Sequence, residues 1–248
     1  MKRKLLFVLF FSLIAITVCF GKDVTLAELA YLANDCYNNY EQKEDVGYGF
    51  RVEKWSNSSG SGFNGVAYTK KNIVVIAFRG TDDPKDLIAD QGIMLTSDSS
   101  LFSFVSFLNF TGYGPSINVG DMIAAKAELD QQIEDAFNFY KKVDKQEKKV
   151  VIVGHSLGGY LAQIVGCKNN IQTYTFNAPG ARTYLPADFK VTDSRARKIH
   201  NYVANNGLNL VPRGTYIGER NNIGGYTHSM KEVYDTIKNN MYPVPIEL

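Results

Sequence analysis

Residues 149–165 read KVVIVGHSLGGYLAQIV. The apolar beginning of this stretch is followed at once by the glycine-rich hexapeptide 154–159 and then by residues typical of a helix. This order predicts a strand, a tight turn with Ser156 at its apex, and a helix. Gly154 and Gly158 stand two residues before and after the serine, where a Cβ atom would collide with the neighbouring strand and helix. The stretch therefore predicts a serine hydroxyl presented for nucleophilic attack.

The predicted turn also supplies donors for an oxyanion. The helix begins at the turn, so its unpaired N–H groups and its positive dipole end point to where negative charge would develop. We expect Leu157 to provide one N–H donor. A second is expected from Thr81, which follows the apolar run 73–78 and offers both a backbone N–H and a hydroxyl. Without the serine, Thr81 would be read as the cap of a simple polar turn.

A serine nucleophile needs a base, and the chain has 3 histidines. His155 is fixed beside the nucleophile and cannot turn to face it, and His200 lies inside a predicted strand. His228 lies in a loop before a C-terminal helix, and the order serine then late histidine is typical of this architecture. We therefore predict His228 as the base.

The chain opens with a segment typical of a secretory signal. Residues 2–4 are basic, and residues 5–20 are apolar apart from one serine and one threonine. This run is short and early for a membrane span, so we expect cleavage near Gly21 and export of residues 22–248 as one domain. The alternatives are an uncleaved membrane anchor and a lipid anchor through Cys19.

The charge balance argues against a nucleic-acid partner. The chain has 27 basic and 25 acidic residues, and three of the basic residues fall within residues 1–21. The mature chain then has 24 basic and 25 acidic residues, a net charge of −1. It shows no basic stripe, and its length suits a single α/β domain, so we expect a monomer that binds no nucleic acid.

Cys36 and Cys167 remain after the predicted cleavage. A disulfide between them would suit an exported protein, and two buried thiols are the alternative. Their spacing does not decide between the two.

Strand and helix signals alternate along the rest of the chain. Capping-box spacing in residues 25–28 predicts a helix to about Tyr40, and residues 57–62 read as a turn. The alternation predicts an α/β fold with a mainly parallel central sheet and helices on both faces. The predicted strands are 63–68, 73–78, 149–153, 173–177 and 198–204, and the further predicted helices are 121–143, 160–165 and 230–239.

One apolar segment, residues 101–110, fits this scheme poorly. Its polar members recur at every third residue, so a helix would carry a narrow polar stripe beside a broad phenylalanine-rich surface. Such a segment is a candidate lid that covers a catalytic pocket and makes transient contact with a lipid interface. An ordinary core helix is the alternative.

Several motifs together resemble one known family. The motifs are AFRGT (77–81), DLIAD (86–90), GHSLGG (154–159), NAPG (177–180) and NGLNLVP (206–212), followed by a late histidine. Over roughly residues 24–240 the chain resembles the class 3 (fungal-type) lipases of the α/β-hydrolase superfamily. The resemblance implies an α/β-hydrolase fold with a lid and a serine esterase acting on acyl esters of lipids. It also implies Ser156 as nucleophile, His228 as base, and Thr81 and Leu157 as the oxyanion hole.

One position departs from the family pattern. Where the family's N-x-x-D-x-V-P stretch has the aspartate that orients the catalytic histidine, this chain has Asn209. An asparagine can accept a hydrogen bond from His228 but cannot stabilise an imidazolium by charge. In the Ser-His-Asp triad of serine proteases the same exchange lowers turnover by about 10⁴.

The departure leaves several interpretations open. The enzyme is slow, the acid comes from Asp188, Asp193 or Glu219, the protein is a non-catalytic relative that binds lipid or a partner, or the asparagine was introduced to inactivate it. Intact Ser156, His228 and Thr81 favour the enzyme, a secreted lipase or phospholipase A acting through an acyl-enzyme. We expect no metal and no cofactor, because no cluster has ligand spacing. Head group and acyl length of the substrate stay open.

Overall fold

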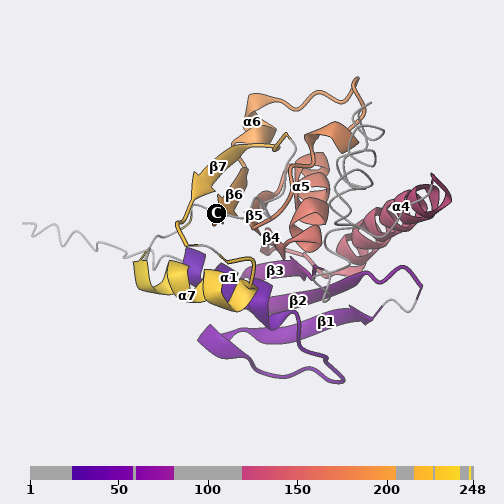
Figure 1. Cartoon of the computed structure of the whole chain (residues 1–248). Coiled ribbons are helices and arrows are strands. Elements are labelled where there is room, and N and C mark those ends of the chain that lie inside the picture. Colours follow the sequence, from indigo (N-terminus) through magenta and orange to yellow (C-terminus); the bar gives the residue numbers. More distant parts are fainter. Residues whose placement is uncertain are drawn as a thin grey trace, which may run out of the picture.

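The computed structural model describes residues 24–57, 60–80, 119–204, 215–225, 227–240 and 246. The predicted signal, the lid candidate 101–110, Thr81 and Asn209 lie outside these ranges. The described strands form one sheet whose spatial order is the chain order (Figure 1). They are β1 (Arg51–Asn57), β2 (Asn64–Lys70), β3 (Ile73–Phe78), β4 (Lys149–His155), β5 (Gln172–Phe176), β6 (Ile199–Val203) and β7 (Glu219–Asn222).

The sheet is antiparallel at one side and parallel over the rest. β1, β2 and β3 pair antiparallel, and each later pair from β3 to β7 is parallel. β2 and β3 form a hairpin. Lys70 pairs with Ile73, so only Lys71 and Asn72 make the turn, with Lys71 in the left-handed region at φ 53°. The predicted α/β fold with a mainly parallel sheet is confirmed.

Helices cover both faces of the sheet, as predicted. They are α1 (Leu26–Asp35), α4 (Val119–Lys142), α5 (Leu157–Asn169), α6 (Asp193–Ala196) and α7 (Met230–Asn240), with short 3-10 turns η1 (Gly47–Gly49) and η3 (Arg182–Tyr184). β3 is buried along its whole length, and its side chains alternate between two apolar clusters. α1 and α7 belong to one cluster, and α4 and α5 belong to the other (Figure 1).

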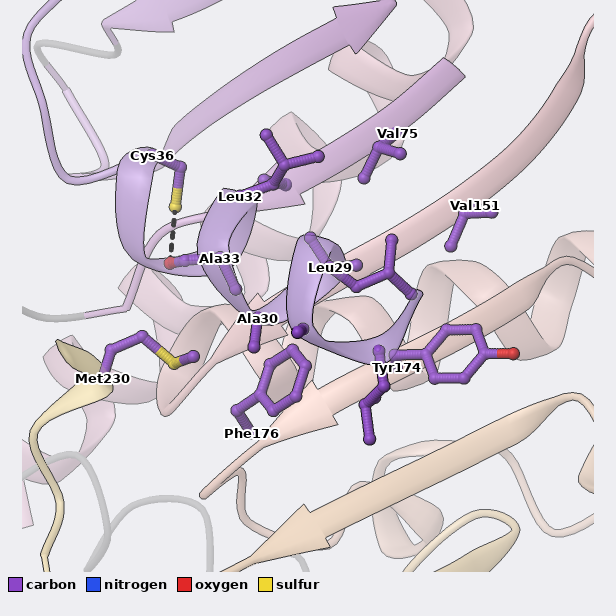
Figure 2. Packing of buried hydrophobic residues seen from close by; sticks show 14 of the residues in the cluster. Leu29, Ala30, Leu32, Ala33, Cys36, Val75, Val151, Tyr174, Phe176 and Met230 are labelled. Atoms are coloured by element: carbon purple, nitrogen blue, oxygen red, sulfur yellow. Dashed lines mark hydrogen bonds between the residues drawn. The ribbon is translucent and has the colours of Figure 1, made fainter. Parts of the chain in front are cut away.

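The first cluster shows how α1 is seated. Its Thr25 and Glu28 form the predicted capping box, which fixes the start of the helix. Figure 2 shows its apolar side chains facing the strands and Met230 of α7. The helix ends at Asp35 rather than near Tyr40. Asp35 is buried and accepts hydrogen bonds from the hydroxyls of Tyr40 and Tyr68, so the chain beyond the helix is fixed by side-chain contacts instead of further helical turns.

The two cysteines lie in different clusters. Cys36 belongs to the cluster of α1 and donates its thiol hydrogen to the carbonyl of Ala33 at 3.2 Å (Figure 2). Cys167 belongs to the cluster of α5 on the other face of the sheet. They are not joined by a disulfide. The alternative of two buried thiols is therefore the correct one.

Two strands and several boundaries differ from the sequence predictions. β1 and β7 form the two edges of the sheet and carry mostly polar, partly exposed side chains, so they lack the apolar signal of the inner strands. α5 begins at Leu157, immediately after the serine, as the predicted turn requires, and it extends to Asn169, beyond the predicted end at residue 165. Within the described ranges, no helix combines the length and the apolar character that crossing a membrane requires.

Candidate active site

Ser156 lies at the apex of a strand-turn-helix elbow between β4 and α5. Its backbone has φ 55° and ψ −127°, a conformation that a non-glycine residue adopts only when its surroundings impose it. Its N–H donates to the carbonyl of Phe176 at 3.0 Å, and its own carbonyl accepts from the N–H groups of Gly159 and Tyr160 at 3.0 and 3.1 Å. These backbone bonds hold the strained residue in place.

The glycines of the elbow are required by close contact. A Cβ atom on Gly154 would lie 2.3 Å from the carbonyl oxygen of Gly158, and one on Gly158 would lie 2.1 Å from that of Phe78. A Cβ atom on Gly80 would lie 2.9 Å from the Cβ of Ser156. The loop after β3 therefore passes directly against the nucleophile.

The structure brings His228 to Ser156. His228 stands just before α7, and its Nε2 lies 3.0 Å from the serine Oγ. The distance suits a hydrogen bond from the hydroxyl to an unprotonated Nε2. Burial lowers the pKa of His228 to about 4, so the imidazole is neutral and able to accept a proton at neutral pH.

The other ring nitrogen of His228 has no acceptor in the described part of the chain. Its Nδ1 is buried and makes no hydrogen bond there. Glu219 accepts instead from His200 Nδ1 at 2.8 Å, and the carboxylates of Asp188 and Asp193 are exposed to solvent. None of these three carboxylates is hydrogen-bonded to Nδ1 of His228. The predicted role of Asn209 stays a prediction, because residues 205–214 lie outside the described ranges.

His155 does not face Ser156 but contacts His228, the predicted base. Its Nε2 lies 2.8 Å from the carbonyl oxygen of His228, so this nitrogen carries the proton and donates. Its Nδ1 then accepts from the hydroxyl of Tyr37 at 2.7 Å. Tyr37 in turn accepts from the N–H of Gly80 at 3.1 Å. A directed chain of hydrogen bonds thus joins the loop after β3 to the backbone of the base.

His155 is neutral throughout the physiological range. Burial and the neighbouring ring of His228 lower its pKa to about 3. The two rings lie 4.9 Å apart between centroids. With its pKa this low and both nitrogens used in hydrogen bonds, His155 is not a second base.

Asn177 also contacts the loop of the base, and sequence reasoning assigned it no role. Its Nδ2 donates to the carbonyl of Thr227 at 2.9 Å, and its Oδ1 accepts from the N–H of Ala204 at 2.7 Å. Its φ of 45° places it in the left-handed region. The NAPG motif was the one sequence feature that could have indicated a role for Asn177. The motif alone does not reveal hydrogen-bond partners 27 and 50 residues away.

Of the two predicted oxyanion donors, only Leu157 lies within the described residues. Leu157 is the first residue of α5, where N–H groups have no partner within the helix and the helix dipole is positive. Gly80 is the last described residue before Thr81 and lies against Ser156, as noted above. The described residues contain no group of three or more potential metal ligands.

Comparison with known proteins finds similarity to phospholipases and lipases. Residues 124–211 match a family model described as "Phospholipase-like: Tle-like phospholipase domain". An extracellular phospholipase A1 of Serratia liquefaciens is 26% identical over 179 residues, which are 68% of this chain and 47% of the relative. The chain therefore spans about half the length of that relative.

Solved lipase structures align with lower similarity. The triacylglyceride lipase of Rhizomucor miehei gives a TM-score of 0.46 at 14% identity, over 79% of this chain and 77% of the lipase. A triacylglycerol lipase of Penicillium expansum gives a TM-score of 0.43 at 18% identity, over 88% of each chain.

The family model and the Serratia relative agree with the motifs of the sequence, and the sheet and elbow are those of an α/β-hydrolase. The resemblance of this chain to the class 3 (fungal-type) lipases of the α/β-hydrolase superfamily is thereby confirmed.

Proposed function

We propose that this protein is a secreted serine hydrolase that cleaves carboxylic esters of lipids, as a lipase or a phospholipase A. The observation that carries the proposal is the 3.0 Å approach of His228 Nε2 to the hydroxyl of Ser156, which is held in a strained elbow at the start of α5. A serine so placed next to an unprotonated imidazole is the arrangement that activates a hydroxyl nucleophile.

The proposed mechanism assigns a role to each of the predicted site residues. Ser156 attacks the ester carbonyl while His228 takes the hydroxyl proton. The oxyanion that develops accepts hydrogen bonds from Leu157 and Thr81. His228 then returns the proton to the departing alcohol and leaves an acyl ester on Ser156. Water, activated in the same way, releases the fatty acid and restores the serine.

Whether the enzyme is efficient or impaired depends on the residue that accepts a hydrogen bond from Nδ1 of His228. The low pKa of His228 and its lack of a carboxylate partner in the described ranges make it a weak base. Asn209 is proposed to accept from its Nδ1 without supplying charge. A catalytically impaired relative that binds lipid or a partner is the second candidate function, and the same observation favours it.

A fluorophosphonate probe tests the proposed nucleophile directly. We expect purified protein to be labelled at Ser156 and the S156A variant not to be labelled, with the site read by peptide mass spectrometry. Absence of labelling in the parent protein would contradict the enzyme and leave the lipid-binding alternative.

Substrate class requires a screen of esters. The phospholipase-like family model and the extracellular phospholipase A1 relative make a phospholipid the first substrate to test. Triacylglycerol and monoacylglycerol complete the panel, with S156A as the blank for each. Release of fatty acid from phospholipid alone would assign a phospholipase A, and release from triacylglycerol alone would assign a lipase.

Export is part of the proposal. Residues 1–21 have the pattern of a secretory signal, and the Serratia relative is named an extracellular enzyme. The mature protein is expected to begin at Lys22 and to be a monomer. Intact mass spectrometry of protein from the culture medium and light scattering of the purified protein check the two expectations.

Contact with a lipid interface is proposed for residues 101–110. Their phenylalanine-rich pattern suits a lid that exposes an apolar surface on opening. Activity on a short ester should then rise abruptly when the substrate concentration passes the point at which an interface forms. A smooth curve through that point would contradict the lid.

A further inference from the structure

We propose that Asn177 and His155 are positioning residues that hold the base in reach of the nucleophile. They bind the carbonyl oxygens of two consecutive residues, Thr227 and His228. We call residues 227–229 the base loop. The inference rests on the proposed function, because it takes His228 as the base and Ser156 as the nucleophile.

The base loop needs support from outside itself. It follows Gly224 and Gly225, which have φ values of 74° and 80°. Glycine has more backbone conformational freedom than other residues, so these two positions do not by themselves hold the base loop rigid. A displacement of about 1 Å between reacting groups can lower a rate by about 10². Hydrogen bonds to the loop's carbonyls therefore have a direct effect on catalysis.

Asn177 is fitted to its position in two ways. It is completely buried, and its amide meets one carbonyl acceptor and one N–H donor, so only one orientation of the amide satisfies both partners. Its backbone lies at φ 45°, a region that asparagine tolerates better than most residues. Glycine would satisfy the backbone alone, and an ionised aspartate would satisfy the N–H donor alone.

The N–H that Asn177 accepts from stands directly before the segment that contains Asn209 in the sequence. Ala204 directly follows β6 and directly precedes residues 205–214, which contain Asn209. The buried amide of Asn177 thus links the base loop to Ala204, the residue before the segment that contains Asn209. Asn177 therefore ties the base loop to the end of β6.

Asn177 is itself on a rigid support. Its N–H donates to the carbonyl of Tyr202 on β6 at 2.9 Å. The chain that follows is held by the buried amide of Gln163 in α5, which donates to the carbonyl of Pro179 at 2.6 Å and accepts from the N–H of Ala181 at 3.2 Å. A loop fixed on the sheet and on α5 can transmit a position to the base loop.

His155 supplies the second point of attachment. It is the last residue of β4, directly before Ser156, so the bond from its ring to the carbonyl of His228 ties the base to the strand that presents the nucleophile. Its tautomer is set by Tyr37, which donates to the other ring nitrogen. The base loop is therefore attached to the ends of both β4 and β5.

The N177D variant tests the proposal because it keeps the shape of the side chain. At pH 8 the new carboxylate still accepts from Ala204 but repels the carbonyl of Thr227. Burial raises the pKa of such a carboxyl, so at pH 5.5 it is protonated and can donate to that carbonyl. Neither His155 nor His228 titrates in this interval, with pKa values of about 3 and about 4.

We expect fluorophosphonate labelling of N177D to be about 10- to 100-fold slower than that of the parent at pH 8. The ratio of the N177D rate to the parent rate should rise at least about fivefold from pH 8 to pH 5.5, because the protonated carboxyl can again donate to the carbonyl of Thr227. On a soluble ester the loss should fall on kcat, with KM unchanged within about twofold.

The N177G variant is the matched control. It accepts the same backbone conformation without strain and loses both hydrogen bonds at every pH, so its labelling should be slow with a flat ratio to the parent. It also keeps the test informative if N177D does not fold, which circular dichroism would reveal. N177G labelled at the parent rate would then overturn the inference.

Two further results would overturn the inference while leaving the proposed function intact. One is labelling of N177D at the parent rate at all pH values. The other is a slow N177D whose ratio to the parent does not change with pH, since this would indicate a general structural defect. A parent protein that is not labelled at all contradicts the proposed function instead.

Discussion

The nucleophile and the base of the candidate site are held by different means. Ser156 is fixed by backbone: glycines packed without room for a Cβ atom, and hydrogen bonds between main-chain groups of β4, β5 and α5. His228 lies on a loop whose two consecutive carbonyls are held by side chains, those of Asn177 and His155. The serine's position therefore depends on small residues near it, whereas the base's position depends on particular polar groups.

This difference has consequences for how substitutions act. A bulkier residue at the elbow displaces main chain, so it should damage folding and chemistry together. A substitution around the base loop removes one hydrogen bond, so it should leave the fold and change the rate or its pH dependence. Four substitutions test that division.

The largest effect is expected from G158A. Its new Cβ would lie 2.1 Å from the carbonyl oxygen of Phe78, so we expect labelling at Ser156 to be lost and the free energy of unfolding to fall by about 3 kcal/mol. Gly60 has no atom within 4 Å of the corresponding position, so G60A is the matched control and should be labelled at the parent rate. Chemical denaturation and labelling measure both. An unchanged G158A would contradict backbone control of the nucleophile.

The second effect concerns charge at the base. N209D should raise the pKa of His228, because a carboxylate beside the ring favours the imidazolium. A stronger base should speed fluorophosphonate labelling by about 10- to 100-fold, with the acidic midpoint of the pH profile moved upward.

The same substitution in an H228A background should give no gain, which separates an effect through the base from an effect on the fold. A rate unchanged or lowered by N209D alone would remove Asn209 from the third position of the site.

The third effect is on stability as a function of pH. His155 and His228 have folded-state pKa values of about 3 and about 4, below the ordinary value of 6.5. Below pH 6.5 the unfolded chain therefore binds protons that the folded chain does not, and stability falls as pH falls. Each histidine contributes a slope of about 1.4 kcal/mol per pH unit until its folded pKa is reached.

H155Q should remove one of these slopes between pH 6.5 and pH 5, while its amide keeps a donor for the carbonyl of His228. Urea denaturation at a series of pH values measures the difference between the two proteins. Parallel curves for parent and variant would mean that His155 is not held neutral in the folded state.

The smallest effect is expected from Y37F. The hydroxyl of Tyr37 joins the N–H of Gly80 to His155, so its removal should loosen the tautomer of His155 and slow labelling by about two- to fivefold. Tyr48 also shares a hydroxyl hydrogen bond, with Tyr234 at 2.7 Å, but this bond is exposed and includes no residue of the base loop. Y48F should therefore leave the rate unchanged, and equal effects in both variants would contradict the chain of hydrogen bonds.

Much of the fold could be predicted because its signals are local. The inner strands are short apolar runs, and the elbow needs glycines within two residues of the serine, so both are visible in a single stretch of sequence. The edge strands β1 and β7 could not be predicted in the same way. An edge strand has no neighbouring strand on one side and meets solvent, so its side chains need not be apolar.

In the candidate site, too, the residues with local sequence signals could be predicted and those with distant partners could not. Ser156, Leu157 and His228 were predicted from motif and chain order, and the structure brings the serine and the histidine together. Tyr37 and Asn177 were missed as site residues, because their partners lie 118 and 50 residues away and only the folded chain reveals them. A side chain that acts on a distant carbonyl leaves no spacing pattern to read.

The separation of Cys36 from Cys167 has a practical consequence. Both thiols are buried, which limits the access of thiol reagents to them, and burial also raises the pKa of Cys167. A single cysteine introduced between residues 101 and 110 would then be the preferred site for a fluorescent or spin label. The opening of the proposed lid on vesicles can thus be followed by spectroscopy in a protein that keeps its native cysteines.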